Sequence, residues 1–154
     1  MCIRDRFNVL RDMQSSGEMA RYFTILTRWF DYNDTFLAKE WAHPSDNIGT
    51  AFAYFTKHKE KNISEFLQSI IQMYEIQGCL ALGTSLNKKG YDHVFYVKLA
   101  SGAVYSSLLS DKNPESISRT VNNVLQDGVN LRSYRQAPNA VSYTHLTLPT
   151  KRIV

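Results

Sequence analysis

The stretch from Tyr91 to Val129 constrains the fold most, because signals for strand, turn and helix follow one another there without conflict. Apolar and polar side chains alternate from Tyr91 to Leu99, which is typical of a β-strand. A two-residue turn at Ser101-Gly102 would bring apolar side chains of two strands onto one face. These side chains are Phe95, Val97, Leu99, Val104 and Leu108. The stretch therefore predicts a β-hairpin.

A helix is predicted directly after this hairpin. Asn113 is a good N-cap, and Pro114 suits the first helical position, where no N–H group is needed. Gly128 is placed to end the helix. The apolar residues between them recur at i, i+4, i+7 and i+8, so they form one stripe. They are Ile117, Val121, Val124 and Leu125.

Helical patterns dominate the chain before the hairpin. Ser15 and Glu18 have the spacing of a capping box, as do Asn62 and Glu65. The expected helices run from Ser15 to Phe30, Thr35 to Ala42, Thr50 to about Lys59, and Ile63 to Gly78. A strand is expected from about Cys79 to Leu86, a short apolar segment. This order predicts an α+β fold, in which N-terminal helices pack on a three-stranded antiparallel meander that is followed by a C-terminal helix.

The chain begins with MCIRDR at residues 1–6 and ends with VSYTHLTLPTKRIV at residues 141–154. The first segment is similar to a translation of the transposon mosaic-end adapter used in tagmentation sequencing of metagenomic libraries. The second resembles the reverse complement of that adapter, read into its primer site. The resemblance implies that both segments are adapter-derived tails, which fold reasoning should exclude. Residues 7–140 then form a single α+β domain, truncated at both ends, for which the sequence indicates no family.

Charge argues against a strongly basic domain once these ends are set aside. The whole chain has 18 Lys and Arg and 14 Asp and Glu residues. Those in the predicted tails are Arg4, Arg6, Lys151, Arg152 and Asp5. Residues 7–140 therefore carry 14 basic and 13 acidic side chains, a net charge of +1, which attracts phosphates weakly. The same range has no long apolar run, so we expect no membrane span and a cytoplasmic protein.

Acidic residues form no recognisable catalytic or metal site. The segment from Asp31 to Asp34 resembles only the opening of a calcium loop, and Ala42 stands where that loop needs its glutamate. Glu75, Asp92 and Asp111 flank the predicted strands, but the chain lacks the Glu-x-Lys triplet of a restriction-nuclease-like site. A hydrolase or nuclease with an unrecognised site is therefore only a third hypothesis.

Thiol and imidazole side chains are no more informative. Cys79 could pair with His93 as a nucleophile, but a small buried thiol is the simpler interpretation. His43, His58 and His93 lack the spacings of zinc ligands, and no cysteine pair accompanies them. We therefore predict no catalytic, cofactor-binding or metal-binding residue and no cofactor, which leaves open whether the protein is an enzyme.

Two surfaces are candidates for binding a partner. Aromatic and apolar residues would share the less apolar face of the predicted sheet, which suits a protein partner or the remainder of the native chain. These residues are Tyr91, Tyr96, Tyr105 and Leu109. A nucleic acid would instead contact lysines, namely Lys57, Lys59, Lys61, Lys88 and Lys89. The most economical prediction is a non-catalytic protein-interaction or assembly module of a larger protein, with nucleic-acid binding as the alternative.

The nucleic-acid alternative has one structural resemblance. The predicted order of helix, three strands and helix from Ile63 to Gln126 resembles the double-stranded-RNA-binding domain. That family binds phosphate through a lysine cluster at the start of its last helix. Here the same position holds Pro114 and Glu115, so the resemblance fails at the binding residues.

Overall fold

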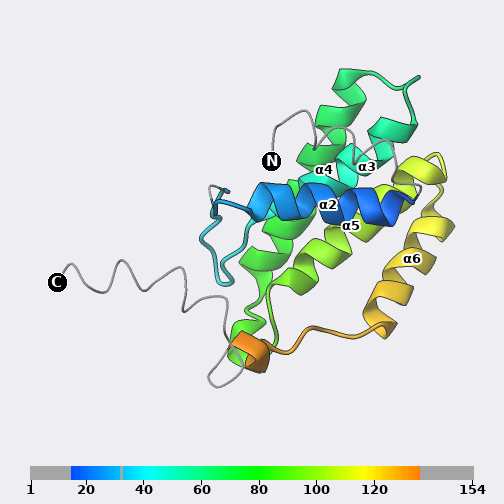
Figure 1. Cartoon of the computed structure of the whole chain (residues 1–154). Coiled ribbons are helices and arrows are strands. Elements are labelled where there is room, and N and C mark those ends of the chain that lie inside the picture. The colour runs from blue at the N-terminus through cyan, green and yellow to red at the C-terminus, as the bar shows by residue number, and fades with distance from the viewer. Residues whose placement is uncertain (1–14, 32, 136–154) are drawn as a thin grey trace.

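The computed structural model describes residues 15–31 and 33–135, and helices joined by loops make up the fold within these ranges (Figure 1). The α-helices are α2 (Ser16–Arg28), α3 (Ile48–Lys57), α4 (Ile63–Gly83), α5 (Val94–Leu109) and α6 (Pro114–Gln126). The 3-10 helices are η1 (Pro44–Asn47), η2 (Asn87–Lys89) and η3 (Arg132–Arg135). The predicted tails at 1–6 and 141–154 lie outside the described residues.

The predicted α+β fold is wrong, because the described ranges contain isolated β-bridges but no strand. The predicted hairpin is the single helix α5, and the predicted strand from Cys79 to Leu86 is largely the end of α4. α5 is buried on several sides, with Phe95, Tyr96, Ala100 and Val104 in the core. A helix enclosed in this way has no continuous polar stripe. Its sequence can therefore show a two-residue alternation that does not correspond to a strand.

Gly102 lets two helices approach each other instead of forming a hairpin turn. A Cβ atom added to Gly102 would lie 3.1 Å from Cγ2 of Val124 in α6. The Thr120 hydroxyl of α6 also donates a hydrogen bond to the Ser106 hydroxyl of α5, at 3.0 Å. The small residue in the middle of the supposed hairpin is thus a helix-packing position.

Three of the predicted helix starts, those capped by Ser15, Asn62 and Asn113, are confirmed. Ser15 accepts a hydrogen bond from the N–H of Glu18 in a complete capping box, and Asn62 caps α4 in the same way. Asn113 accepts hydrogen bonds at the start of α6, at 3.0 Å from Glu115 N and at 3.2 Å from Ser116 N. Cap signals are local, and so they hold even where the tertiary prediction fails.

The predicted helix at residues 35–42 is a loop in the structure. Phe36 and Ala42 exchange backbone hydrogen bonds of 2.9 and 3.0 Å across it. The carboxylate of Glu40, which is 1% exposed, accepts a hydrogen bond from the Ser85 hydroxyl at 3.0 Å. This bond fixes the loop against the end of α4, which outweighs the weak helical pattern.

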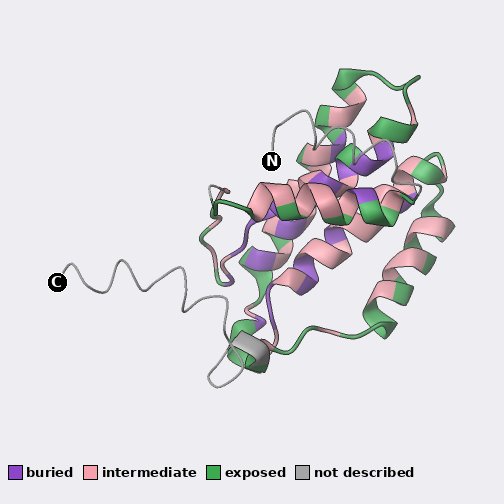
Figure 2. Cartoon of the chain, in the orientation of Figure 1, coloured by how far each residue is buried: buried purple, intermediate pink, exposed green. Residues whose placement is uncertain are grey.

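α4 and α5 form the centre of the described chain. α2 packs on α3, while α4 and α6 lie on either side of α5. One apolar cluster joins α3, α4 and α5, and it contains Ala51, Met73, Ala100 and Val104. A second cluster lies where α4 ends and α5 begins, and it contains Ala81, Leu86, Phe95 and Tyr96. Buried residues accordingly concentrate on α3, α4, α5 and the loop before α3 (Figure 2), whereas α6 has none.

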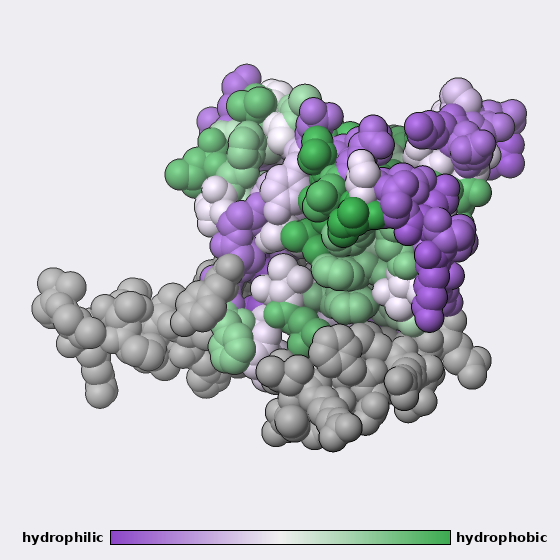
Figure 3. Space-filling model, turned by 90° about the horizontal axis from the view of Figure 1, so that it is seen from above, coloured by the Kyte–Doolittle hydropathy of each residue, from purple (hydrophilic) through white to green (hydrophobic). Residues whose placement is uncertain are grey.

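Large hydrophobic side chains also remain on the surface. Ile63, Leu67 and Ile71 are 70%, 52% and 57% exposed and recur at i, i+4 and i+8 along α4, so they form a stripe. We call these three residues the α4 stripe. Hydrophobic residues also gather across the middle of the face seen in Figure 3. Among the described helices none combines the length and the apolar character needed to span a membrane.

We expect Gly49→Ala to destabilise the chain by about 1–3 kcal/mol, because overpacking a close contact forces the backbone to shift. A Cβ atom at Gly49 would lie 2.6 Å from the carbonyl oxygen of Ala20 in α2. Urea unfolding measures the effect. Gly17→Ala is the matched control, since nothing lies within 4 Å of its added Cβ atom. Equal stability of the two variants would contradict this account of the α2–α3 contact.

Candidate active site

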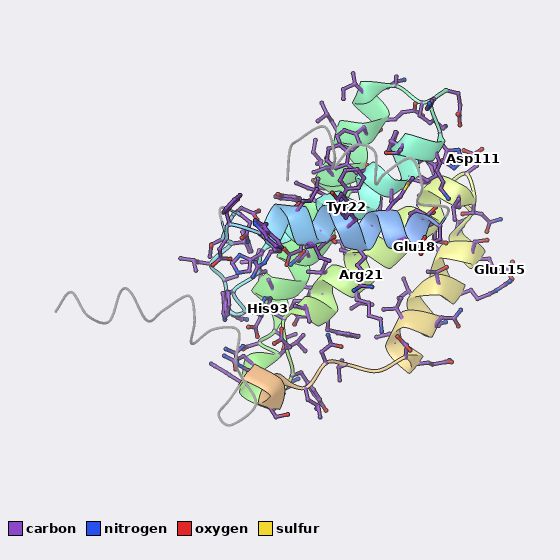
Figure 4. All side chains as sticks on the ribbon, in the orientation of Figure 1. Glu18, Arg21, Tyr22, His93, Asp111 and Glu115 are labelled. Atoms are coloured by element: carbon purple, nitrogen blue, oxygen red, sulfur yellow. The ribbon has the colours of Figure 1, made fainter. Side chains whose placement is uncertain are left out.

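Two buried histidines occupy equivalent positions, each immediately before a helix. His43 is the N-cap residue of η1 and His93 is the N-cap residue of α5. They are 8% and 1% exposed. Figure 4 shows His93 at the start of α5, beside the loop that leads into η1. Two imidazoles from segments far apart in the sequence therefore reach one place.

Trp41 joins the two imidazoles. Its ring centroid lies 4.4 Å from that of His93 and 5.1 Å from that of His43, and the two imidazole centroids are 5.8 Å apart. The indole is half-buried. It covers both titratable rings with an apolar surface, which keeps water away from them and strengthens electrostatic interactions between neighbouring groups.

The position of the proton on neutral His43 follows from its hydrogen bond. Nδ1 lies 2.6 Å from the backbone carbonyl oxygen of Asp34. A carbonyl oxygen can only accept, so Nδ1 must donate and carry the proton. In the neutral ring Nε2 then holds the lone pair. His43 is thus prepared to take up a proton at Nε2.

His93 has a different polar neighbour, a carboxylate. Its Nδ1 lies 3.3 Å from Oδ1 of Asp92, and both side chains are almost fully buried. The same Asp92 oxygen accepts the backbone N–H of Val94 at 3.1 Å, which holds the carboxylate in place. A buried carboxylate beside an imidazole is an arrangement that enzymes use for proton transfer. His93 is therefore a candidate for proton transfer.

Two carboxylates, those of Asp34 and Asp46, lie near Tyr74. Oδ1 of Asp34 accepts a hydrogen bond from the backbone N–H of Ser45 at 3.0 Å, and Asp46 pairs with Arg28 at 3.7 Å. Burial raises the pKa of Tyr74 well above its ordinary value, and the charge of Asp34, a hydrogen bond to Asp34 and the charge of Asp46 raise it further. The phenol therefore stays protonated and can act as a hydrogen-bond donor.

The chemistry available to this arrangement is proton transfer. Two imidazoles in different polar surroundings can divide the roles of base and acid. The indole of Trp41 shields both rings from water. In the described ranges, no group of three or more His, Cys, Asp or Glu side chains is arranged to hold a metal ion. Cys79, which the sequence paired with His93, is an exposed residue on α4.

The predicted protein-binding residues do not share one face, since the sheet that would have grouped them is absent from the described chain. Tyr96 is 2% exposed, and its hydroxyl donates to the carbonyl oxygen of Thr84 at 3.0 Å. Tyr91 is half-buried against the same cluster as Tyr96. Tyr105 packs edge-on against Tyr54, and Leu109 is 58% exposed at the end of α5. A role for these residues in partner binding stays a prediction without the geometry that suggested it.

The predicted nucleic-acid contacts fall into two separate groups. Lys57, Lys59 and Lys61 precede α4, whereas Lys88 and Lys89 follow it, and all of them are exposed. α4 has 21 residues, so roughly 30 Å separates the groups at 1.5 Å per residue. Lys61 also pairs with Glu65 at 3.1 Å. The lysines therefore do not make one continuous basic patch.

Sequence reasoning missed the grouping of His43, His93 and Trp41. The search for ligand spacings considered the histidines, but a site assembled from two loops has no spacing to detect. One signal was present. His43 and His93 each have an aromatic residue or an acid close by in the sequence and a helix directly after them, a combination that places a polar side chain at a helix N-terminus.

Comparison with known proteins identifies relatives. Residues 15–148 match the family model described as the MmgE/PrpD N-terminal domain. The chain is 44% identical over 126 residues to a 2-methylcitrate dehydratase of Cupriavidus necator, which covers 76% of this chain and 26% of that protein. It is 42% identical over 123 residues to the 2-methylcitrate dehydratase of Escherichia coli K12, an alignment that covers 74% of this chain and 25% of that protein. It is 39% identical over 127 residues to the mitochondrial 2-methylcitrate dehydratase of Yarrowia lipolytica, which covers 76% of this chain and 24% of that protein. The chain thus spans about a quarter of the length of these relatives.

These matches correct the sequence-based interpretation of family and function. No family was expected for residues 7–140, yet the match covers 15–148 and continues into the segment interpreted as an adapter-derived tail. The relatives are named as enzymes, so the prediction of a non-catalytic interaction or assembly module is wrong. Nucleic-acid binding and a hydrolase or nuclease activity are not supported either.

The raised pKa of Tyr74 predicts a loss of stability at high pH. Above pH 10 or so the tyrosine ionises in the unfolded chain while it stays protonated in the folded chain, so the folded state binds more protons. The free energy of unfolding should therefore fall as pH rises through this range. Tyr74→Phe should show a smaller fall between pH 8 and pH 11, measured by urea unfolding. The same fall in both proteins would contradict the burial of this phenol beside Asp34.

Proposed function

Because this chain belongs to the MmgE/PrpD family, we propose that the complete protein is a dehydratase that removes water from 2-methylcitrate or a closely related hydroxylated tricarboxylic acid. The observation that carries the proposal is the pair of buried imidazoles on Trp41, each with a different polar neighbour. The names of the relatives supply the substrate class. The geometry supplies a division of labour between the two rings.

Removal of water from a hydroxy acid needs a base and an acid. The base takes a proton from the carbon next to the hydroxyl-bearing carbon, and the electron pair of that C–H bond forms the C=C double bond. The C–O bond breaks at the same time or afterwards, and the acid gives the leaving hydroxyl a proton, so that water departs. General acid and base catalysis of this kind contributes about 10²–10⁴-fold each.

His43 fits the role of base and His93 the role of acid. The bond from Nδ1 of His43 to the carbonyl oxygen of Asp34 keeps the lone pair of the neutral ring on Nε2. The Asp92 carboxylate, 3.3 Å from Nδ1 of His93, stabilises the protonated ring that an acid requires. After turnover the rings have exchanged charge states, and proton exchange with water restores them.

The rest of the protein would complete the site. The chain spans about a quarter of its relatives, and the α4 stripe exposes three large apolar side chains. We propose that the remainder of the native polypeptide is the partner that covers this stripe, because contiguous apolar residues on a surface usually contact another segment. A cytoplasmic location is part of the same proposal.

The test uses a chimera in which this chain replaces the corresponding quarter of the Cupriavidus necator dehydratase. We expect the chimera to convert 2-methylcitrate into an unsaturated tricarboxylate, followed by ultraviolet absorbance of the new double bond. His43→Gln and His93→Gln should each lower kcat by about 10²–10⁴-fold, because each removes a proton-transferring group.

His58→Gln is the matched control. His58 is the C-cap residue of α3; its Nδ1 lies 3.1 Å from Glu60 and its ring stacks on Tyr54. Its kcat should equal that of the unsubstituted chimera. A folded chimera that leaves 2-methylcitrate unchanged while the parent enzyme dehydrates it would refute the proposed activity.

A further inference from the structure

A segment after α6 is attached directly beside the candidate active site. The backbone N–H of Asp92 donates a hydrogen bond to the carbonyl oxygen of Asn130 at 2.7 Å. The backbone N–H of Arg132 donates one to the carbonyl oxygen of Gly90 at 2.9 Å. Between these bonds Tyr91 and Leu131 form an antiparallel bridge. Residues 130–132 are thus fixed by their backbone against the residues that lead into His93.

This attachment brings the guanidinium group of Arg132 to Trp41. Cζ of Arg132 lies 6.0 Å from the centroid of the indole ring, a distance at which a cation is attracted to the face of an aromatic ring. The same indole lies 4.4 Å from the ring of His93. The guanidinium, the indole and the imidazole therefore form a continuous series of contacts.

One N–H group of the Arg132 guanidinium has no acceptor within the described part of the chain. Its Nη1 atom is buried, yet it has no hydrogen-bond partner. Two other arginines have acidic partners: Arg28 pairs with Asp46 at 3.7 Å, and Arg119 pairs with Glu115 at 2.8 Å. A buried guanidinium N–H without a partner is costly, so its presence suggests that a ligand supplies the acceptor.

We propose that Arg132 binds a carboxylate of the substrate, with the face of Trp41 as its support. The planar guanidinium presents paired N–H donors that match the two oxygens of a carboxylate. A substrate carboxylate held here would lie on the same indole as the two imidazoles, so the site favours carboxylic acids. This inference rests on the proposed dehydratase function and adds the residue that recognises the acid.

The test again uses the chimera with the Cupriavidus necator dehydratase. Arg132→Gln should raise KM for 2-methylcitrate by about 10–100-fold, the effect of losing a hydrogen bond to a charged group, with a smaller change in kcat. The same variant should weaken, by a similar factor, the binding of propane-1,2,3-tricarboxylate, measured by calorimetry. That probe has the carboxylates but no hydroxyl group to lose. Arg132→Lys should recover part of the affinity, because it keeps the charge but not the paired donors.

Arg119→Gln is the matched control. Arg119 is on the outer surface of α6, paired with Glu115, and its loss should leave KM and probe binding unchanged. Unchanged KM and probe affinity in Arg132→Gln would overturn the proposal, as would a fall in kcat alone. If circular dichroism shows that Arg132→Gln does not fold, Arg132→Lys decides, and wild-type probe affinity in that variant would overturn it.

Failure of the dehydratase function gives a different result. A chimera that performs no dehydration, but binds the tricarboxylate probe more weakly after the Arg132→Gln change, would retain the carboxylate site and lose the proposed reaction. A chimera that dehydrates 2-methylcitrate equally well with Gln at position 132 would keep the proposed reaction and lose the proposed carboxylate site.

Discussion

One buried amide, that of Asn47, holds together the elements on which the candidate active site depends. Its nitrogen donates to the carbonyl oxygen of Pro44 at 2.9 Å and to Oε1 of Gln77 at 2.5 Å, while its oxygen accepts from the Ser101 hydroxyl at 2.8 Å. The side chain is fully buried, so these bonds compete with little water. They join η1 to the middle of α4 and of α5. Because His43 directly precedes Pro44, the bond to the Pro44 carbonyl also fixes the backbone from which that imidazole projects.

The sequence predicted local structure well and tertiary structure poorly, and the residues explain why. Caps at Ser15, Asn62 and Asn113 depend on one side chain and the next turn of backbone, so a short pattern contains all the information. α5 depends on neighbours that the sequence does not reveal. Its apolar residues face α3, α4 and α6 together, which removes the polar stripe that distinguishes a helix from a strand. Gly102, which looked like a turn residue, is small because Val124 lies against it.

The candidate active site was harder to predict for a related reason. Motif searches look for chemical groups at fixed separations in one element, whereas His43 and His93 come from separate loops and meet on Trp41. Each histidine alone resembles an ordinary loop residue. Their burial, and the contrast between a carbonyl neighbour and a carboxylate neighbour, become visible only when the loops are placed on α4. What distinguishes the two histidines is therefore their surroundings and not their spacing in the sequence.

The contact at Gly102 has a consequence for the outer helix that it seats. α6 contributes no buried residue, yet it is continuous with the segment that carries Arg132 to the indole. Its position is fixed by the close approach of Val124 to Gly102 and by the ion pair between Lys98 and Asp127. The two contacts therefore set where the segment that leads from α6 to Arg132 begins. A larger side chain at position 102 would meet Val124 and displace α6, and the start of that segment would move with it.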